Sequence, residues 1–382
     1  MTNSGREVPT LIRVLNISSD TNIGGAGRCI LNFLAHYDRS AFQVDVALPR
    51  GSLLLPEVRR LDTRAFEVDG IGDKSLDLRA IKKLKALIRE TDPQVVHTHG
   101  AMSGRIAARQ CGKAVVYTRH SVFPVSRRLS RQPGKWLNGK INEHYADEII
   151  AVAEAAKENL VESGISPERV EVILNGVSAL DRLSAEEVAA EKVKYGIAPE
   201  RFVAGILARM EAVKGHSYLL EAAKLLKERG DPLTVVIAGT GSQEDALRQM
   251  AEDLALGDTV VFAGFVSDVR LLLSIFDLQV NASYGTEATS LALLEGMSMG
   301  IPAVVTDYGG NPGVITQGEN GLLVPTRDSG ALAEAISGML HDRAEYRRMA
   351  EGCKEIFEQK FTVDRYARNI EEVYRRAAGK RG

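Results

Sequence analysis

Short apolar runs rich in Val, Ile and Leu alternate with stretches of helical periodicity along almost the whole chain. Regular alternation of buried strands and helices predicts parallel sheets with right-handed crossovers. The first set of predicted strands is Leu11–Ile17, Phe42–Leu48, Ala65–Val68, Gln94–His97, Ala114–Thr118, Glu148–Val152 and Val170–Leu174. The second set is Phe202–Leu207, Leu233–Ala238, Val260–Phe262, Leu278–Asn281, Ala303–Val305 and Leu322–Val324. The pattern therefore favours an α/β protein with two sheets.

The alternation pauses between the two sets of strands, and this pause predicts a division into two domains. We place the linker near residues 175–182, so that two Rossmann-like, doubly wound domains span 1–177 and 178–361. A last helical pattern, Val363–Arg376, comes after the second sheet is complete.

Composition narrows the class of protein without naming a function. A chain of 382 residues is too long for one ordinary core, which agrees with two domains. A net charge of −2 gives no support to nucleic-acid binding. Three scattered cysteines form no metal or disulfide pattern, so we expect a reducing, cytoplasmic setting. We expect neither a signal peptide nor a membrane span, since no apolar run approaches about 18 residues.

The segment 283–302 holds two carboxylates, Glu287 and Glu295, with seven residues between them. Glu295 lies in an apolar run with helical spacing, and Glu287 lies in the loop before it. The free N–H groups and positive dipole end of such a helix suit a phosphate. Eight helical positions span about 12 Å, so the two acids can grip both ends of an elongated polar ligand. The alternative is an exposed Glu287 and a helix-capping Glu295.

Two cations, Arg209 and Lys214, lie five positions apart in the loop after Phe202–Leu207. Their charges match a nucleotide diphosphate, because arginine binds phosphate in a bidentate way and lysine acts as a point charge. The chain has no Asp-x-Asp metal motif. A pair of surface ion-pair residues is the alternative.

Glycines follow several predicted strands. Gly24 and Gly25 open the first helix, where backbone N–H groups can approach a diphosphate closely. The second strand ends without the acid that a dinucleotide site needs for its ribose, so an NAD site is disfavoured. Gly241 belongs to a Gly-Thr-Gly loop after another strand. Each of these turns also has a purely structural interpretation.

Histidines lie where two neighbouring strands of the first set end. His97 and His99 are on one side of a strand, and His120 ends the next strand. Strand ends of this kind point into the ligand crevice of an open parallel sheet. We expect no metal site, since no third ligand is evident. We expect His97 to be structural.

One segment of the first domain, residues 122–140, combines cations with apolar residues and contains no acid. It includes Arg127, Arg128, Arg131 and the only tryptophan, Trp136. Such a segment suits an anionic membrane surface or a lipid diphosphate acceptor. Basic residues on a solvated helix face are the alternative.

Together these motifs resemble those of family 4 retaining glycosyltransferases, which have two Rossmann-like domains and the GT-B fold. The matching elements are the Glu-x₇-Glu pair and an Arg-x₄-Lys-Gly loop, with a Gly-Gly-x-x-Arg loop in the first domain. The resemblance implies that the two domains face each other across a cleft. It also implies that the last helix, within 362–382, crosses back to pack on the first domain.

The resemblance also implies roles for the site residues. Glu287 would lie near the donor sugar, and Glu295 would bind the ribose hydroxyls. Arg209 and Lys214 would stabilise the leaving diphosphate in place of a metal. The donor-binding set would further include Gly24, Gly25, Gly241, Val266, Thr289, Ser290 and Leu291. His120 would reach the donor sugar from the first domain.

Two departures from the family pattern bear on the sugar pocket. The residues after Glu287 are Ala288, Thr289 and Ser290, where family members often have Gly-Phe-Gly or Gly-Phe-Pro. Gly313 stands where relatives commonly have glutamate.

The expected function is transfer of a sugar from a nucleotide-diphosphate sugar to a hydroxyl acceptor, with retention and without cofactor or metal. We expect a role in cell-envelope or extracellular polysaccharide or glycolipid synthesis, at the inner face of the plasma membrane. A sugar-nucleotide epimerase of the same architecture is one alternative, and a non-catalytic carbohydrate-binding or structural protein is another.

Overall fold

The computed structural model describes residues 11–72, 76–100 and 102–380, and the chain divides into two compact units. The first unit comprises the residues up to His120, then Pro124–Gly176, and the chain from Val363 onward. The second unit comprises Val177–Thr362 together with Ser121–Phe123.

The first unit is built on a seven-stranded parallel sheet with the strand order β3-β2-β1-β4-β5-β6-β7. Its strands are β1 (Ile12–Ser18), β2 (Phe42–Pro49), β3 (Ala65–Val68), β4 (Val95–His99), β5 (Ala114–Arg119), β6 (Glu148–Ala151) and β7 (Val170–Val172). All seven predicted strands are present. The prediction ended β4 too early, at His97, because the polar Thr98 and His99 are buried inside the strand.

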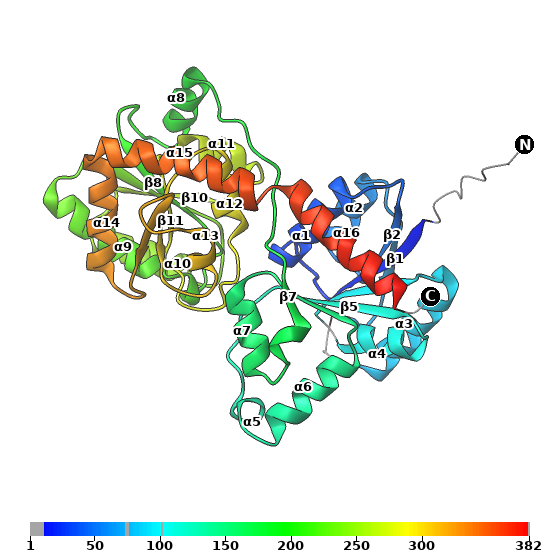
Figure 1. Cartoon of the computed structure of the whole chain (residues 1–382). Coiled ribbons are helices and arrows are strands. Elements are labelled where there is room, and N and C mark those ends of the chain that lie inside the picture. The colour runs from blue at the N-terminus through cyan, green and yellow to red at the C-terminus, as the bar shows by residue number, and fades with distance from the viewer. Residues whose placement is uncertain (1–10, 73–75, 101, 381–382) are drawn as a thin grey trace, which may run out of the picture. The chain divides into compact units, whose positions relative to one another are not determined.

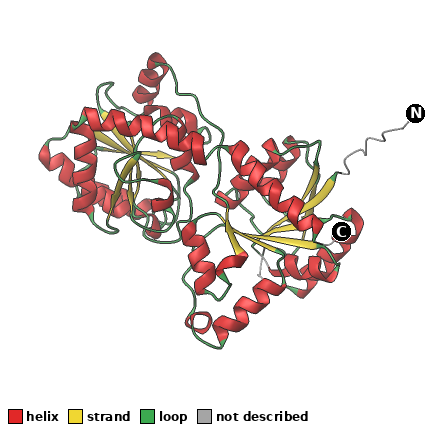
Figure 2. Ribbon diagram, in the orientation of Figure 1, coloured by secondary structure: helices red, strands yellow, loops and turns green. Residues whose placement is uncertain are grey.

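Helices flank this sheet on both sides, as Figure 2 shows. They are α1 (Gly25–His36), α2 (Leu54–Arg60), α3 (Leu78–Thr91), α4 (Met102–Gln110), α5 (Arg127–Ser130), α6 (Gly134–His144), α7 (Glu154–Glu162), the 3₁₀ helix η1 (Pro167–Arg169) and α16 (Val363–Gly379). Asp77 caps α3, because its carboxylate accepts hydrogen bonds from the backbone N–H groups of Arg79 and Ala80.

The second unit is built on a six-stranded parallel sheet with the strand order β10-β9-β8-β11-β12-β13. Its strands are β8 (Phe202–Leu207), β9 (Leu233–Ala238), β10 (Val260–Gly264), β11 (Leu278–Asn281), β12 (Ala303–Thr306) and β13 (Gly321–Val324). Its helices are α8 (Ala185–Lys194), η2 (Ala212–Lys214), α9 (His216–Arg229), α10 (Glu244–Asp253), α11 (Val269–Ile275), α12 (Leu291–Ser298), α13 (Asn311–Val314), α14 (Ser329–His341) and α15 (Arg343–Lys360). The sequence-based prediction of an α/β fold with two doubly wound domains is confirmed.

Helix α16, although last in the sequence, belongs to the first unit, as the resemblance implied. It packs beside α1 and against β1, β4 and β5 (Figure 1). The side chain of Tyr374 on this helix is fully buried, with its ring edge against Phe33 of α1. The apolar face of the helix is therefore part of the first core.

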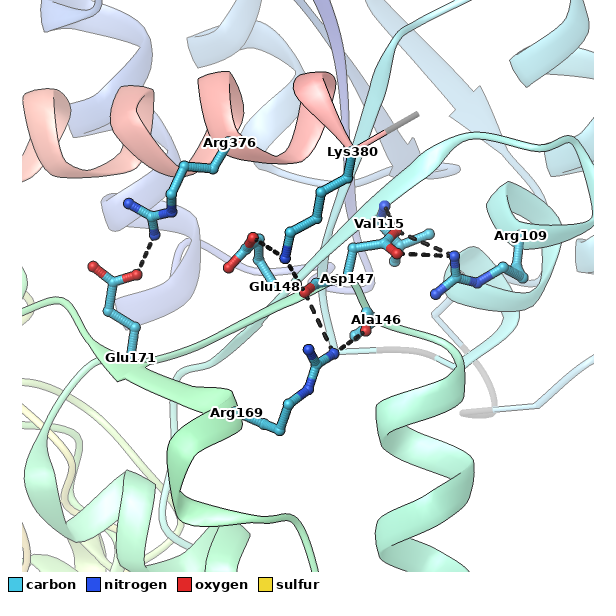
Figure 3. Close-up of polar contacts among 9 residues, drawn as sticks. All are labelled: Arg109, Val115, Ala146, Asp147, Glu148, Arg169, Glu171, Arg376 and Lys380. Atoms are coloured by element: carbon cyan, nitrogen blue, oxygen red, sulfur yellow. Dashed lines mark hydrogen bonds and ion pairs between the residues drawn. The ribbon is translucent and has the colours of Figure 1, made fainter. Parts of the chain in front are cut away.

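Ion pairs fix the far end of α16 to the sheet edge (Figure 3). Arg376 pairs with Glu171, and Lys380 Nζ lies 2.6 Å from Glu148 Oε1. Below them Asp147 is held by Arg109, whose Nη1 lies 3.0 Å from Oδ1, and by the backbone N–H of Val115. The helix is thus anchored by packing along its length and by charges at its end.

Candidate active site

The loops that follow the strands of the second sheet contact one another, and glycines make this close approach possible. A Cβ on Gly239, which has φ +130°, would come within 2.1 Å of the carbonyl oxygen of Ala208. A Cβ on Gly241 would come within 2.4 Å of the carbonyl oxygen of Met210. The N–H of Met210 donates to the carbonyl of Thr240 at 2.9 Å, so the loop after β8 lies on the loop after β9.

The loop after β8 also lies against the end of β11. Gly215 adopts φ +72°, and a Cβ there would come within 2.0 Å of the carbonyl oxygen of Ala282. The backbone N–H of Tyr284 donates to the carbonyl of Val213 at 2.9 Å. Lys214, between these two contacts, is therefore brought to the residues that follow β11.

Glu287 is buried, with 5% of the residue exposed, and its carboxylate is held by three donors. Lys214 Nζ lies 2.6 Å from Glu287 Oε2. The same oxygen accepts from Ser283 Oγ at 3.0 Å and from Asn281 Nδ2 at 3.5 Å. Hydrogen bonds from these three donors fix the position of the buried carboxylate. The alternative that Glu287 is an exposed residue is wrong.

A further layer of polar side chains supports this carboxylate. Thr306 Oγ1 donates to the carbonyl of Ser283 at 2.5 Å, and Asn311 Nδ2 donates to the carbonyl of Thr306 at 3.0 Å. The loop before α13 closes over Glu287, because a Cβ on Gly309 would come within 2.1 Å of the Glu287 carbonyl oxygen. Sequence reasoning missed Ser283 and Thr306, although polar residues where apolar strands end were an available signal.

Helix α12 begins at Leu291, directly after the loop that contains Glu287. Ser290 is its N-cap residue, and its side chain makes no capping hydrogen bond. The backbone N–H groups of the first turn are therefore not capped by Ser290. Glu295 is the fifth residue of the helix and is partly exposed, so the alternative that it caps the helix is wrong.

The other predicted donor-site residues of the second unit lie at the same edge of the sheet. Arg209 is exposed after β8, which is the neighbour of β11 in the sheet. Val266 follows β10 and is partly buried against the core, whereas Phe265 beside it is 74% exposed. The N–H of Gly239 donates to the carbonyl of Gly264 at 2.8 Å, which joins the loops after β9 and β10.

In the first unit the predicted histidines form a cluster in which His97 and His99 are buried and His120 is partly exposed. His97 Nδ1 lies 2.8 Å from the hydroxyl of Tyr374, and its Nε2 lies 2.7 Å from Thr118 Oγ1. His99 Nδ1 lies 2.9 Å from His120 Nε2. Burial lowers the pKa of His97 to about 3 and that of His120 to about 4, and it lowers the pKa of His99 well below its usual value. All three rings are therefore neutral at pH 7.

At the start of α1, no contact with the described protein requires glycine in place of a larger residue. A Cβ on Gly24 or Gly25 would meet no described atom within 4 Å, and neither residue has a positive φ. Gly27, one turn further, differs because a Cβ there would come within 2.9 Å of the Leu54 side chain.

The basic segment forms α5 and α6, and its apolar side chains are exposed. Trp136 is 58% exposed and Leu137 is 53% exposed, and Arg127 and Arg131 are exposed as well. Exposed apolar residues also include Phe123, Leu129 and Ile141. Arg128 lies outside the residues whose side chains the structure describes.

Within residues 11–72, 76–100 and 102–380, no group of three or more His, Cys, Asp or Glu side chains is placed to hold a metal ion. The helices of that part of the chain include none that is long and apolar enough to cross a membrane.

Comparison with known proteins agrees with this geometry. Residues 23–179 match the family model Glycosyltransferase Family 4, and residues 187–356 match the model Glycosyl transferases group 1. EpsD of Bacillus subtilis (strain 168), which carries a glycosyltransferase name, is 30% identical over 314 residues, or 78% of this chain and 80% of EpsD. The chain belongs to glycosyltransferase family 4.

Two further relatives of this glycosyltransferase have informative names. The UDP-Gal:alpha-D-GlcNAc-diphosphoundecaprenol alpha-1,3-galactosyltransferase of Escherichia coli is 26% identical over 309 residues, which cover 78% of this chain and 79% of that enzyme. The crystal structure of Anabaena Alr3699/HepE in complex with UDP superposes with a TM-score of 0.82 at 22% identity, covering 95% and 99% of the two chains. The Anabaena protein has also been solved with UDP-glucose. The structural likeness shows that the fold is shared.

Proposed function

We propose that this glycosyltransferase moves a sugar from a nucleotide-diphosphate sugar to a hydroxyl acceptor, with retention at the anomeric carbon and without a metal ion. The observation that carries the proposal is the ion pair of Lys214 with the buried Glu287, 2.6 Å apart. This pair holds a cation at the sheet edge from which α12 begins. A fixed cation near an uncapped helix N-terminus is suited to the charge that develops on a departing diphosphate.

Charge stabilisation is the main chemical task that we assign to the second unit. When the bond between the anomeric carbon and the diphosphate oxygen breaks, its electron pair stays with the diphosphate. Arg209, Lys214 and the backbone N–H groups of Thr289, Ser290 and Leu291 would receive that charge. Lys214 keeps donors free for phosphate, because an ammonium group has three protons and Glu287 takes one.

Other residues would hold the uncharged parts of the donor. The three contacts of Glu287 described above all use Oε2, and we assign Oε1 to the sugar hydroxyls. Glu295 would bind the ribose hydroxyls, and His120 would orient the sugar. The loops with Gly241 and Val266 would lie against the nucleoside.

Gly24 and Gly25 fit close approach of the donor diphosphate to the protein backbone. Their side-chain positions are open, and the described protein itself does not require glycine there. A bound diphosphate would require glycine there, because a side chain would keep it away from the backbone N–H groups.

The names of relatives support a donor and an acceptor class. The Escherichia coli enzyme is named for a UDP-galactose donor and an acceptor linked to diphosphoundecaprenol, and the Anabaena protein binds UDP and UDP-glucose. We therefore propose a UDP-sugar donor and a lipid-linked or cell-envelope glycan acceptor. With a lipid-linked acceptor, the reaction would take place at the cytoplasmic face of a membrane.

Peripheral attachment to that membrane would use the exposed residues of α5 and α6. Trp136 and Leu137 would enter the interface while Arg127, Arg128 and Arg131 meet anionic head groups, each cation contributing about 1 kcal/mol. Co-sedimentation with anionic and neutral vesicles across a salt series tests this. Wild type should bind anionic vesicles at low salt, and the variant with the three arginines changed to Gln should not. Equal, negligible binding of both proteins would favour a soluble acceptor.

The donor proposal is tested by a thermal-shift screen of nucleoside diphosphates and sugar nucleotides. A true ligand at 100 times its dissociation constant adds about 2.7 kcal/mol to the free energy of unfolding. With the best donor, transfer should persist in EDTA, and the product should keep the anomeric configuration when followed by NMR. Loss of activity in EDTA with recovery on adding a divalent ion would overturn the metal-free mechanism.

A further inference from the structure

Asn16, His99 and His120 form a continuous hydrogen-bond chain in the first unit. Asn16 lies on β1 and His99 on the neighbouring strand β4, and both are buried, with 2% and 6% exposed. His99 Nε2 lies 2.9 Å from Asn16 Oδ1, and His99 Nδ1 lies 2.9 Å from His120 Nε2. The chain therefore runs from a buried amide to the histidine that follows β5.

The positions of the protons follow from these contacts. A neutral imidazole has one donor and one acceptor nitrogen. The amide oxygen of Asn16 can only accept, so His99 carries its proton on Nε2. His99 Nδ1 is then an acceptor, and His120 must donate to it from Nε2. The nitrogen left without a proton is His120 Nδ1.

The hydroxyl of Tyr374, on the C-terminal helix, lies 3.4 Å from the same oxygen of Asn16 and 2.8 Å from His97 Nδ1. With the amide oxygen on this side, the hydroxyl can donate to Asn16 and accept from His97, while His99 donates to the same oxygen. Asn16 Nδ2 then has no partner among the described residues.

His120 Nδ1 is a buried acceptor that no described residue satisfies. A buried polar atom without a partner costs free energy that a bound donor group would recover. We propose that Asn16 and His99 are positioning residues that keep the proton of His120 on Nε2, so that His120 Nδ1 accepts a hydrogen bond from a hydroxyl of the donor sugar. This inference rests on the proposed function, which brings the sugar to His120.

Asn16, the last member of the hydrogen-bond chain, determines whether His120 can act as a base or only as a hydrogen-bond acceptor. A histidine backed by a carboxylate is stabilised in its charged form and suits proton transfer. Here the last member is an amide, which cannot take up a proton or balance a charge. His120 is therefore an acceptor of hydrogen bonds rather than a base. The site selects a hydroxyl that can donate, and fluorine at that position of the sugar would be disfavoured.

The proton positions are measurable by NMR on the full-length protein with ¹⁵N-labelled histidine and no ligand. Long-range ¹H–¹⁵N spectra at pH 7 should show His120 protonated on Nε2 and bare on Nδ1, with signals assigned by His120→Gln. Asn16→Leu should give a mixture of the two tautomers, and Asn16→Asp should restore the wild-type tautomer. His97→Gln is the matched control, because the ring of His97 packs beside His99 but its hydrogen bonds go to Tyr374 and Thr118. It should leave the His120 tautomer unchanged.

Two results would overturn the assignment. One is a wild-type His120 protonated on Nδ1, which corresponds to the reverse orientation of the Asn16 amide. The other is a tautomer unchanged by Asn16→Leu. Should Asn16→Leu fail to fold, the wild-type spectrum decides the question alone.

The sugar contact is tested by calorimetry with UDP, UDP-glucose, UDP-galactose and UDP-N-acetylglucosamine. His120→Ala should leave UDP affinity within about twofold, while the affinity of the best sugar nucleotide falls about fivefold to a hundredfold. An equal loss for UDP and its sugar nucleotide, or no loss for either, would remove the hydroxyl contact. Absence of binding by wild type to all four probes would contradict the proposed donor class, and the tautomer would still stand on its own spectrum.

Discussion

Glu287 in the second unit and His99 in the first are both buried beside the carboxyl end of a parallel sheet. They differ in their partners, because Glu287 has a charged partner and His99 has only neutral ones. Glu287 is matched by the Lys214 cation and by hydroxyl and amide donors. His99 is matched by the Asn16 amide and by a second neutral imidazole, His120. One site holds balanced charges, whereas the other excludes charge altogether.

Under the proposed function, this difference would match the two halves of a sugar nucleotide. A diphosphate needs cations that are already in place, and a buried cation is stable only with a partner such as Glu287. A sugar is uncharged, so it needs acceptors and donors with fixed proton positions. In the proposed function the first unit would provide these, because burial keeps its histidines neutral.

The largest expected effect comes from breaking the charged site. Lys214→Ala leaves Glu287 buried without its cation, so we expect the free energy of unfolding to fall by about 3–5 kcal/mol. We also expect turnover to fall about a hundredfold to a thousandfold, more than the affinity for the sugar nucleotide falls. Urea unfolding and steady-state kinetics measure the two effects.

Arg209→Ala is the matched control for this variant. Arg209 is exposed, so its loss should change the free energy of unfolding by no more than about 0.5 kcal/mol while turnover still falls. Equal destabilisation by the two variants would show that the Lys214–Glu287 pair is not the special feature of the site.

A smaller effect is expected at the helix beside this site. Glu295→Gln should weaken nucleotide binding about tenfold to a hundredfold, because hydrogen bonds to a charged group contribute about 1.5–3 kcal/mol. Calorimetry on the folded variant measures it, with the exposed Glu252→Gln of α10 as control. Unchanged affinity in Glu295→Gln would remove the ribose role.

Histidines that the fold holds neutral should make the free energy of unfolding depend on pH. Burial lowers the pKa of His97 to about 3 and those of His120 and His216 to about 4, whereas histidine in an unfolded chain has a pKa of about 6.5. Below pH 6.5 the unfolded chain therefore binds more protons, and the free energy of unfolding falls as the pH falls. Each histidine should contribute about 2 kcal/mol of this loss between pH 7 and pH 5.

Urea unfolding at the two pH values checks this expectation. His97→Gln should reduce the loss by one histidine's share, and Arg209→Ala should keep the wild-type loss. Stability that does not change between pH 7 and pH 5 would mean that these rings are not held neutral by the fold.

The smallest effects are expected where α16 meets the first sheet. Tyr374→Phe keeps the ring but removes the hydroxyl that contacts His97 and Asn16, so it should cost about 0.5–1.5 kcal/mol. Arg376→Gln removes an exposed ion pair with Glu171 and should cost less than about 1 kcal/mol. Thermal unfolding ranks the two variants, and the reverse order would contradict the role given to the Tyr374 hydroxyl.

The sequence was a good guide to the strands because each is an apolar run that both faces of a parallel sheet bury. It was a poorer guide where function places polar residues inside the sheet. The predicted range of the fourth strand stopped at His97, yet His99 ends β4 as a buried member of the histidine cluster. Periodicity cannot identify such a position, since only tertiary partners make a buried imidazole acceptable.

The site residues show the same limit. Spacing and family resemblance singled out Lys214 and Glu287, but 73 positions separate them and nothing in the pattern indicates that they pair. The contact depends on Gly215 approaching the backbone of Ala282, which is a property of the folded loops. Similarly, Asn16 was not identified, because one asparagine in an apolar strand carries no periodic signal.

The closure of the first core by α16 has a consequence for the order of folding on the ribosome. Tyr374 contacts Asn16 across 358 positions, and the whole of residues 177–362 is synthesised between them. The second unit is contiguous apart from Ser121–Phe123, so nearly all of its chain has been made before the ribosome reaches α16. Until that helix emerges, Phe33 and the histidine face of the first sheet lack the helix that covers them. We therefore expect the nascent first unit to expose this face throughout synthesis of the second, and to be the part of the molecule most dependent on chaperones.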